Sequence, residues 1–424
     1  MIVEIISVGT EILLGNIVNT NANYLAKKCA ELGLSSYFQV AVGDNETRLS
    51  SVIETALNRS DILILTGGLG PTQDDMTKEA TAKVLQRPLM MDEHSRERIL
   101  SYFHGIDTSK RGSDGLAAIT ENNWKQAMKI AGCLVVDNDN GTAPGYIVET
   151  GQKRIILLPG PPSELIPMFE VSIFPYLKKL QNKVFLSKMV KITGIGESRA
   201  ETLILDLIEG QTNPTIAPYA KSGEVHFRIT ASDESEEAAH RRLLPLLEEL
   251  NSRFQENIYT TKEEETLEDV VASLLIKHHL TLASAESCTG GLLTGRIVNV
   301  PGVSKILREG FITYSNEAKM KYLGVSEGTL NRYGAVSEQT AKEMAVGAAK
   351  AAKANASLAI TGIAGPDGGT EEKPVGLVYI SCYLNDQVIV KECRFRGSRE
   401  KVRELSVITA LDLLRRCLLK FYGL

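Results

Sequence analysis

Residues 284–291 read Ser-Ala-Glu-Ser-Cys-Thr-Gly-Gly and give the clearest indication of how this chain folds. The apolar run 280–283 precedes them, and a helix-like run, 292–298, follows. A strand that passes through a glycine turn directly into a helix is the repeating unit of α/β folds. The pattern predicts that Ser287 lies at the top of a strand and in the first turn of a helix. Backbone N–H groups and the positive end of the helix dipole are available there.

A serine in such a turn has two interpretations. It can act as a nucleophile on a carbonyl carbon, with the neighbouring N–H groups holding the oxyanion that forms. Alternatively, the turn is a structural one, in which a capped helix begins after two glycines. The adjacent Cys288 is a second candidate nucleophile, but the sequence offers it no evident activating partner.

A second glycine loop follows the apolar run 356–360. Residues 361–370 read Thr-Gly-Ile-Ala-Gly-Pro-Asp-Gly-Gly-Thr. Glycines allow the backbone to approach a ligand and to turn N–H groups toward an anion. The Gly-Lys-Ser/Thr of a Walker-type loop is missing, so we expect backbone and hydroxyl donors to hold any phosphate here.

A third glycine loop lies in the N-terminal half. The apolar run 61–65 leads into Thr-Gly-Gly-Leu-Gly-Pro-Thr-Gln-Asp-Asp at 66–75. Both distant loops share Thr-Gly-x-x-Gly-Pro, but their flanks differ, which indicates two independent sites rather than an internal repeat. Three glycine loops at the carboxyl ends of strand-like runs favour an α/β enzyme with two sites.

Composition limits the class of protein. A chain of 424 residues with 43% hydrophobic residues is expected to form two or three domains with their own cores. The net charge of −5 argues against nucleic-acid binding, and no apolar run approaches the length of a membrane span. Six cysteines without Cys-x-x-Cys spacing indicate reduced thiols, and the N-terminus lacks a basic signal region. We therefore expect a cytoplasmic protein.

The order of elements predicts three regions. Residues 1–170 alternate strand and helix signals, which predicts a mainly parallel sheet covered on both faces, a three-layer α/β domain. Residues 171–255 read as a small α+β unit, in which Pro245 is expected to kink or split the last helix. A charged linker then leads to a capping-box sequence at Thr266, which opens a second three-layer α/β domain at 256–424.

The chain offers few groups that can activate Ser287. None of the six histidines lies in a glycine loop, and His278 and His279 precede the strand, at its far end. Residues 311–320 place Tyr314 at the end of a strand and Lys319 about one turn into the next helix. A partly desolvated lysine has a lowered pKa and can act as a base; the alternative is a surface lysine beside a buried aromatic ring.

The N-terminal half carries acidic residues at its strand ends and in its glycine loop. Hard carboxylate oxygens suit Mg²⁺ or Mn²⁺, which commonly bridge to phosphates. For Asp74 and Asp75 the alternative interpretation is helix capping. Glu164 also follows a strand end. The candidate metal ligands are Glu11, Asp44, Asp74 and Asp75.

These motifs together resemble the competence/damage-inducible CinA family, and the resemblance covers essentially the whole chain. The N-terminal matches are Gly-Thr-Glu-Ile-Leu-Leu-Gly (9–15), Thr-Asn-Ala-Asn (20–23), Gly-Asp-Asn (43–45), the loop at 66–75 and Leu-Pro-Gly-Pro-Pro-Ser-Glu (158–164). The C-terminal matches are Ala-Glu-Ser-Cys-Thr-Gly-Gly (285–291), Thr-Tyr-Ser-Asn-Glu-Ala-Lys (313–319), Gly-Ala-Val-Ser (334–337) and Gly-Ile-Ala-Gly-Pro-Asp-Gly-Gly (362–369).

The resemblance implies two activities. The first domain is similar to molybdopterin-binding folds and is expected to hydrolyse ADP-ribose to AMP and ribose 5-phosphate with Mg²⁺, Mn²⁺ or Co²⁺. The middle unit is expected to be KH-like. The last domain is expected to deamidate nicotinamide mononucleotide to nicotinic acid mononucleotide without a cofactor. Its implied catalytic residues are Ser287, Tyr314, Lys319 and Thr361.

We expect the three glycine loops and a nearby arginine to bind substrate. Arg399 or Arg403 is the candidate cation. The other expected substrate-binding residues are Thr289, Gly290, Gly291, Gly362, Gly365, Asp367, Gly368, Gly369, Gly67, Gly68, Gly70 and Thr72. The expected partners are small nucleotides and a second copy of the chain in a homodimer, without nucleic acid or membrane. Two other functions remain open: a competence-linked regulatory protein, for which we expect a basic stripe or a tail, and a molybdopterin-binding protein.

Overall fold

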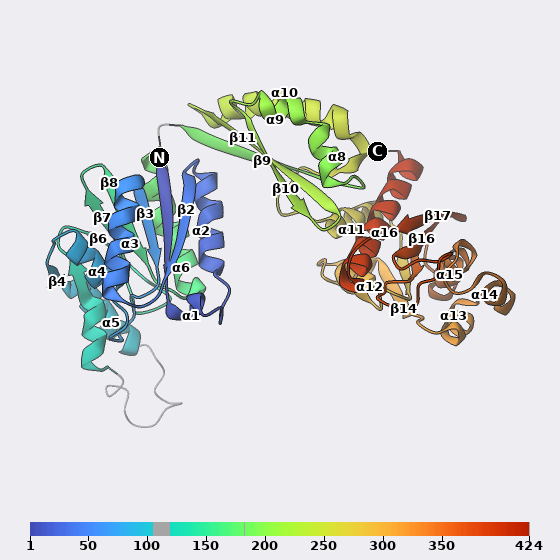
Figure 1. The fold of residues 1–424 in the computed structure, drawn as a ribbon, viewed down its shortest axis with the longest axis horizontal. Coiled ribbons are helices and arrows are strands. Elements are labelled where there is room, and N and C mark those ends of the chain that lie inside the picture. The colour runs from blue at the N-terminus through green and yellow to red at the C-terminus, as the bar shows by residue number, and fades with distance from the viewer. Residues whose placement is uncertain (105–118, 182, 424) are drawn as a thin grey trace. The chain divides into compact units, whose positions relative to one another are not determined.

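The computed structural model describes residues 1–104, 119–181 and 183–423. The chain forms two compact units, Met1–Leu186 with Ser232–Ala239, and Ser187–Ala231 with His240–Leu424. Mainly parallel sheets form the first and last domains, and a smaller antiparallel sheet lies between them in the sequence (Figure 1). The predicted α/β fold class is confirmed.

The first sheet has the strand order β2-β1-β3-β8-β7-β6, in which β2, β1, β3 and β8 are parallel. β1 lies between β2 and β3. The connection from β1 adds β2 on one side of it, and the next connection crosses over to add β3 on the other side. Ligands of open α/β sheets bind at the carboxyl ends of strands at such a switch point. The strands are β1 (Ile2–Val8), β2 (Ser35–Val42), β3 (Ile62–Thr66), β6 (Leu134–Val136), β7 (Gly145–Thr150) and β8 (Lys153–Leu158).

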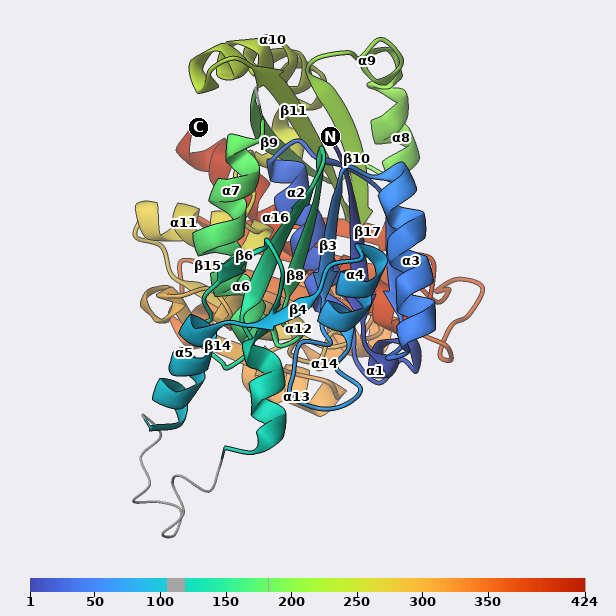
Figure 2. The same cartoon turned by 90° about the vertical axis from the view of Figure 1, so that its left-hand side faces the viewer.

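Helices cover both faces of this sheet, as the predicted three-layer domain requires. α2, α6 and α7 pack on one face, and α3 and α4 pack on the other (Figure 2). Successive strand residues point to opposite faces, so Ile5 belongs to the first core and Ile6 to the second. The helices are α1 (Thr10–Leu13), α2 (Thr20–Glu31), α3 (Glu46–Arg59), α4 (Thr77–Val84), α5 (Glu93–His104), α6 (Pro162–Met168) and α7 (Phe174–Lys179).

The segment after β8 belongs to the first domain. Phe169, Ile173 and Leu177 are fully buried in the same core as α2 and β1. The core therefore continues to α7, whereas the sequence had placed the boundary at residue 170, inside this helical run. The remaining elements of this unit are η2 (Glu121–Ala127), η3 (Phe169–Ile173) and a two-stranded sheet of β4 (Leu89–Met91) and β5 (Met128–Ile130).

The middle sheet has the order β10-β11-β9-β12. Its last strand, β12, pairs antiparallel with β9, so the sheet extends past residue 255, the expected end of this unit. The helix at 236–254 continues through Pro245, so the expected split does not occur, and the kink expected as its alternative stays a prediction. The elements are β9 (Val184–Thr193), α8 (Glu197–Thr202), α9 (Leu205–Glu209), β10 (Thr215–Lys221), β11 (Glu224–Asp233), α10 (Glu236–Phe254), η4 (Gln255–Asn257) and β12 (Ile258–Thr260).

The last sheet has the order β14-β13-β15-β16-β17. β13 pairs in parallel with both β14 and β15, so the chain again changes direction at a central strand, and the carboxyl ends of these three strands share one edge. β16 and β17 extend the sheet antiparallel. The strands are β13 (Leu282–Glu286), β14 (Leu307–Ile312), β15 (Ala356–Gly362), β16 (Leu377–Leu384) and β17 (Gln387–Arg394).

Two helical layers enclose this sheet. α11, α12 and α16 pack on one face, and α13, α14 and α15 on the other. α11 opens with the predicted capping box of Thr266 and Asp269. α15 contacts the end of α13 so closely that a Cβ on Gly347 would lie 1.9 Å from the carbonyl oxygen of Leu323. The helices are α11 (Leu267–Lys277), α12 (Leu292–Val298), η5 (Val303–Lys305), α13 (Asn316–Leu323), α14 (Glu327–Tyr333), α15 (Glu338–Ala352) and α16 (Arg399–Tyr422).

Within the described residues, no helix has both the length and the apolar character that a membrane crossing requires.

Candidate active sites

Ser287 directly follows β13, the strand that lies between β14 and β15 in the last sheet. Side chains alternate along β13, so Ala283 and Ala285 face the α13–α15 layer while Glu286 reaches the start of α12. Continuing this alternation by one residue places Ser287 on the α13 side. Its backbone N–H donates to Ile360 O at 3.0 Å, which extends the sheet by one residue.

Glu286 changes the expected role of the glycine turn. Its fully buried carboxylate accepts hydrogen bonds from the backbone N–H groups of Gly291, Leu293 and Thr294 at 3.0, 3.0 and 2.8 Å. α12 begins after Gly291, so Ser287 lies ahead of the helix rather than in its first turn. The N–H groups expected to hold an anion at this helix end are therefore already occupied, and the N–H of Gly290 donates to Ser287 O.

Lys319, the base that the sequence suggested, lies in contact with Ser287. The lysine lies one turn into α13, which Ser315 caps, and its side chain is fully buried. Its Nζ lies 3.1 Å from Ser287 Oγ, 2.8 Å from Thr313 O and 3.1 Å from Tyr314 O. A neutral amine with two hydrogens and one lone pair can donate to both carbonyls and accept the serine proton. The three contacts place the lysine amine within reach of the Ser287 hydroxyl proton.

Burial shifts the pKa of Lys319 and of the rival nucleophile Cys288 in opposite directions. Desolvation lowers the pKa of Lys319 from 10.5 to about 8, so a useful fraction is neutral near physiological pH. Burial instead raises the pKa of the Cys288 thiol to about 11, which keeps it protonated and weakly nucleophilic. The geometry and the pKa shifts both favour Ser287 over Cys288.

The other expected catalytic residues lie around this pair. In the β13–β15 register Glu286 faces Ile360, so the next position places Thr361 beside Ser287; the buried Thr361 hydroxyl donates to Ala335 O at 2.7 Å. The Tyr314 side chain is 64% exposed, and its hydroxyl lies 3.5 Å from Arg399 Nη2. Tyr314 therefore faces outward, and its carbonyl, rather than its phenol, contacts the lysine.

Two arginines connect α16 to the loops of this site. Arg399 donates to Gly365 O at 2.7 Å, in the second glycine loop. Arg403 donates to Cys288 O at 3.1 Å and Thr289 O at 2.8 Å, and so fixes the turn after the nucleophile. Arg399 thus lies at the glycine loop and Tyr314, whereas Arg403 holds the backbone of the turn.

The second glycine loop is an exposed loop with anchored ends. Lys373 donates to Tyr333 O at 2.6 Å and to Val336 O at 2.8 Å, which fixes its C-terminal part. Gly365 and Gly368 have φ angles of +81° and +88°, in the left-handed region that favours glycine. The expected residues Asp367, Gly368 and Gly369 are exposed, and Gly362 is half-buried at the end of β15.

The histidine alternative finds no support in the geometry. His278 ends α11, at the far end of β13 from Ser287, and its ring stacks on Tyr422 with the centroids 4.5 Å apart. The sequence interpretation also missed Glu286. A carboxylate at the end of a mostly apolar strand was the available signal, because a buried charge requires several donors.

The loops of the first domain converge on a cavity of about 590 Å³. They follow β1, β2, β3 and β8, the four parallel strands, so they share one edge of the sheet. Gly67 requires glycine: its φ is +99°, and a Cβ there would lie 2.2 Å from Val8 O. Of the expected residues, the cavity lining includes Glu11, Asp44, Gly67, Gly68, Gly70, Asp74 and Asp75.

Several of these acids hold the loops together. Asp44 Oδ2 accepts from the N–H and hydroxyl of Thr10 at 2.9 and 2.8 Å, and Asp75 Oδ2 accepts from the N–H of Thr72 at 2.9 Å. Thr72, which does not line the cavity, thus holds the Asp75 carboxylate by hydrogen bonds. No group of three or more acidic, histidine or cysteine side chains in the described residues is arranged to hold a metal ion.

The sequence interpretation missed the amide and lysine side chains that fix this cavity. Asn21 donates to Thr66 Oγ1 at 3.0 Å and to Gly160 O at 2.7 Å, which joins the loops after β3 and β8. Lys125 donates to Thr72 O and Asp75 O from outside the cavity. Asn21 lies in the motif at 20–23, and its position there was the signal that could have identified it. No sequence pattern marks Lys125.

Comparison with known families supports this division of the chain. Residues 4–179 match the family described as "Probable molybdopterin binding domain". Residues 187–260 match "Damage-inducible protein CinA KH domain", and residues 264–418 match "CinA C-terminal domain". The middle sheet is therefore a KH domain between two α/β domains.

Full-length relatives show the same assignment. A "Putative competence-damage inducible protein" of Clostridium beijerinckii is 51% identical over 417 residues, 98% of this chain and 99% of the relative. A "CinA-like protein" of Kosmotoga olearia is 51% identical over 416 residues, 98% of both chains. A solved CinA superfamily structure from Escherichia coli shares 39% identity over 38% of this chain and 97% of its own, with a TM-score of 0.35. The chain belongs to the CinA family.

Proposed function

We propose that the protein is a bifunctional hydrolase of pyridine-nucleotide salvage. Its C-terminal domain deamidates nicotinamide mononucleotide to nicotinic acid mononucleotide and ammonia, and its N-terminal domain hydrolyses ADP-ribose to AMP and ribose 5-phosphate. The contact of 3.1 Å between the buried Lys319 amine and Ser287 Oγ carries the amidase proposal. A buried lysine beside a strand-end serine is costly to fold and is expected where catalysis needs a base.

The amidase step uses this pair twice. Neutral Lys319 takes the Ser287 proton as Oγ attacks the amide carbon, and the resulting ammonium returns the proton to the departing ammonia. The acyl ester on Ser287 is then hydrolysed by a water that Lys319 deprotonates, which releases the carboxylate product and restores the serine. The positive charge of the pyridinium ring in the substrate further favours the neutral lysine.

Backbone N–H groups next to Ser287 supply the oxyanion donors in this proposal. The N–H groups of Cys288 and Thr289 have no backbone acceptor among the described residues, in contrast to those of Gly291 and the first residues of α12, which Glu286 occupies. Arg403 holds the carbonyls of the same two residues and so fixes the orientation of this turn. Arg399, at the second glycine loop, is the proposed cation for the substrate phosphate.

The cavity of the first domain fits a metal-bound diphosphate. Five carboxylates line it, and the described lining contains no lysine or arginine, so a diphosphate needs a cation to enter. Magnesium commonly uses one or two protein carboxylates and completes its shell with phosphates and water, which requires no preformed cluster of three. Glu11, Asp44, Asp74 and Asp75 are the proposed ligands, and the ion would neutralise charge on the phosphates.

Molybdopterin binding is a second candidate function for the first domain. The match of residues 4–179 to a molybdopterin-binding family favours it. A pterin phosphate and a nucleotide diphosphate would both need the glycine loop to bind phosphate oxygens. The geometry of the loop therefore does not distinguish the two ligands. Pterin fluorescence that copurifies with the protein would support this candidate, and its absence together with ADP-ribose hydrolysis would exclude it.

One experiment tests the proposed function directly. The purified full-length protein is incubated with nicotinamide mononucleotide and, separately, with ADP-ribose and Mg²⁺, and ammonia and AMP are assayed in each reaction. Ammonia from the first and AMP from the second are the expected results. Failure of either reaction at saturating substrate would refute that half of the proposal.

A further inference from the structure

Glu164 occupies a different environment from the other acids of the N-terminal cavity. It lies in the first turn of α6, after β8, and its half-buried carboxyl lines the cavity. Asn138 Nδ2 donates to its Oε2 at 2.6 Å. Its Oε1 has no hydrogen-bond partner in the part of the chain that the structure describes. One oxygen is therefore held in place, and the other remains available to a ligand or water.

The loop between β6 and β7 is built against this carboxyl. A Cβ on Gly141 would lie 2.3 Å from Glu164 Oε2, so a larger residue at 141 would displace the carboxyl from its present position. Asn138 is 7% exposed, donates also to Ala143 O at 2.9 Å, and accepts at Oδ1 from the N–H of Asn140 at 3.0 Å. These contacts fix the amide orientation, so its nitrogen rather than its oxygen faces Glu164.

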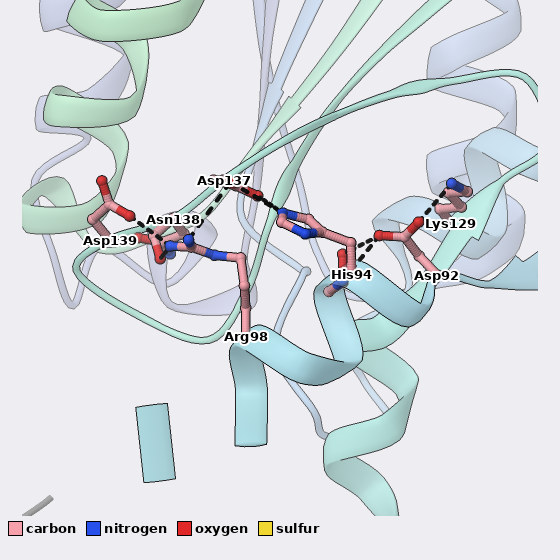
Figure 3. A network of polar contacts seen from close by, with 8 residues as sticks. Asp92, His94, Arg98, Lys129, Asp137, Asn138 and Asp139 are labelled. Atoms are coloured by element: carbon pink, nitrogen blue, oxygen red, sulfur yellow. Dashed lines mark hydrogen bonds and ion pairs between the residues drawn. The ribbon is translucent and has the colours of Figure 1, made fainter. Parts of the chain in front are cut away.

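A charged network outside the cavity secures the same loop. Arg98 of α5 donates to Asn138 O at 3.1 Å and Asp139 Oδ1 at 2.5 Å (Figure 3). His94, also on α5, lies 3.0 Å from Asp137 Oδ1. The network therefore holds Asn138 from the α5 side while its amide reaches Glu164, and it leaves the carboxyl itself free of any ion pair.

Two of the four proposed metal ligands, Asp44 and Asp75, differ from Glu164 in their hydrogen bonds. Asp44 and Asp75 share their oxygens with Thr10 and Thr72, next to the loops after β1, β2 and β3. Burial raises the pKa of Glu164, and the hydrogen bond from Asn138 lowers it; no charged neighbour contributes. The other charged groups that face this cavity are Glu11, Asp44, Asp74 and Asp75. A carboxyl of this kind resembles a general base more than a metal ligand.

We propose that Glu164 is the general base of the N-terminal reaction and that Asn138 is its positioning residue. This inference rests on the proposed ADP-ribose hydrolysis. Glu164 accepts a proton from a water molecule, whose oxygen attacks a phosphorus atom of the diphosphate. The bond from that phosphorus to the bridging oxygen breaks, and the bridging oxygen leaves on the other phosphate. AMP and ribose 5-phosphate are the products, and Glu164 then releases its proton to solvent.

The first test compares Glu164→Gln with the wild-type protein. Glutamine keeps the shape and the contact with the cavity but cannot take a proton. We expect kcat for ADP-ribose to fall about 100-fold or more, as loss of a general base typically causes. The dissociation constant for ADP-ribose and the Mg²⁺ concentration for half-maximal rate should stay within about twofold. A large change in the Mg²⁺ requirement would make Glu164 a metal ligand and overturn the proposal.

The second test uses Asn138→Ala, with His94→Gln as the matched control. Loss of the amide removes a donor that stabilises the carboxylate, so the acid limb of the rate profile should move to higher pH. His94→Gln alters the α5 network without touching Asn138 and should keep the wild-type profile. An infrared titration of the Glu164 carboxyl band, identified by its loss in Glu164→Gln, should show the same upward pKa shift without any turnover.

The outcomes separate this inference from the proposed function. If the wild-type protein hydrolyses ADP-ribose and Glu164→Gln does so equally well, the proposed function stands and the role of Glu164 is refuted. If the wild-type protein binds ADP-ribose with Mg²⁺ but releases no AMP, the proposed function fails, and the assignment of Glu164 fails with it. An unshifted infrared pKa in Asn138→Ala refutes the positioning role alone.

Discussion

The two Thr-Gly-x-x-Gly-Pro loops have the same spacing but lie beside different sets of polar side chains. Each follows a parallel strand next to a switch point, and each threonine hydroxyl donates to a backbone carbonyl, Thr66 to Pro159 at 3.1 Å and Thr361 to Ala335 at 2.7 Å. The first loop faces a cavity lined by five carboxylates. The second lies beside a serine and a buried lysine.

The comparison indicates that the shared motif determines the backbone conformation of the loop and not the type of reaction beside it. Glycine and threonine close the strand end and leave room for a ligand, and the neighbouring strands supply the reactive groups. A carboxylate-lined cavity needs a cation to accept a phosphate, whereas the lysine site needs to lose a proton to act. The two sites should therefore respond differently to mutation, to chelation and to pH.

The largest expected effect is the loss of ammonia release in Ser287→Ala. Removing the nucleophile should lower the amidase rate by roughly 10³-fold or more and leave ADP-ribose hydrolysis unchanged, because the two sites belong to different domains. Both products are measured on the same preparation. A fully active variant would shift the nucleophile to Cys288, despite its raised pKa.

Replacing Lys319 should have the next largest effect and should alter the pH profile. With a pKa of about 8, the lysine gains its neutral, active form as pH rises, so the amidase rate should increase through an inflection near pH 8. Lys319→Met should remove this limb and lower the rate about 10²-fold to 10³-fold. Lys319→Arg should not rescue it, because arginine stays protonated. Near-wild-type turnover in Lys319→Met would leave Tyr314 as the candidate base.

Chelation should affect the N-terminal site and leave the C-terminal site active, the reverse of the two substitutions above. EDTA is expected to stop ADP-ribose hydrolysis and to spare the amidase, since the proposed metal ligands lie only in the first domain. Asp74→Ala or Asp75→Ala should mimic EDTA, with a loss of about 10²-fold in the AMP assay. Equal inhibition of both activities by EDTA would contradict the metal-free serine mechanism.

The smallest expected effect concerns stability. The pKa of Lys319 is about 8 in the folded chain and close to 10.5 when unfolded, so between these values the unfolded state binds more protons. Stability should therefore rise with pH across this window, by up to about 3 kcal/mol at 1.4 kcal/mol per pKa unit. Chemical unfolding of the wild-type protein and Lys319→Met at pH 7.5 and 10 measures the difference. A parallel response in both proteins would show that the lysine is not desolvated.

Strand and loop order was largely predictable from the sequence. Apolar runs that end in glycine loops predicted the parallel sheets, and the position of Lys319 one turn into a helix after Tyr314 predicted the contact with Ser287. Such predictions succeed because strand alternation and helix periodicity are local properties. The capping box at Thr266 was predictable for the same reason.

The remaining features depend on contacts between distant residues. Glu286 occupies the N–H groups of α12, and Asn138 reaches Glu164 from a loop 26 positions away in the sequence. Neither partner is marked by a local pattern, because hydrogen-bond geometry between segments depends on the packing of the whole domain. The uninterrupted helix at Pro245 is a similar case, in which local propensity was outweighed by tertiary context.

The close approach of α15 to α13 has a consequence for how this family can vary. Gly347 has no chemical role, yet it faces the carbonyl oxygen of Leu323, at the end of the helix that carries Lys319. A single added methyl group there would push α13 outward and withdraw the amine from Ser287. We therefore expect substitutions at this interior helix position to impair the proposed amidase reaction at a distance. A screen for inactivating substitutions should recover it alongside the residues that perform the reaction.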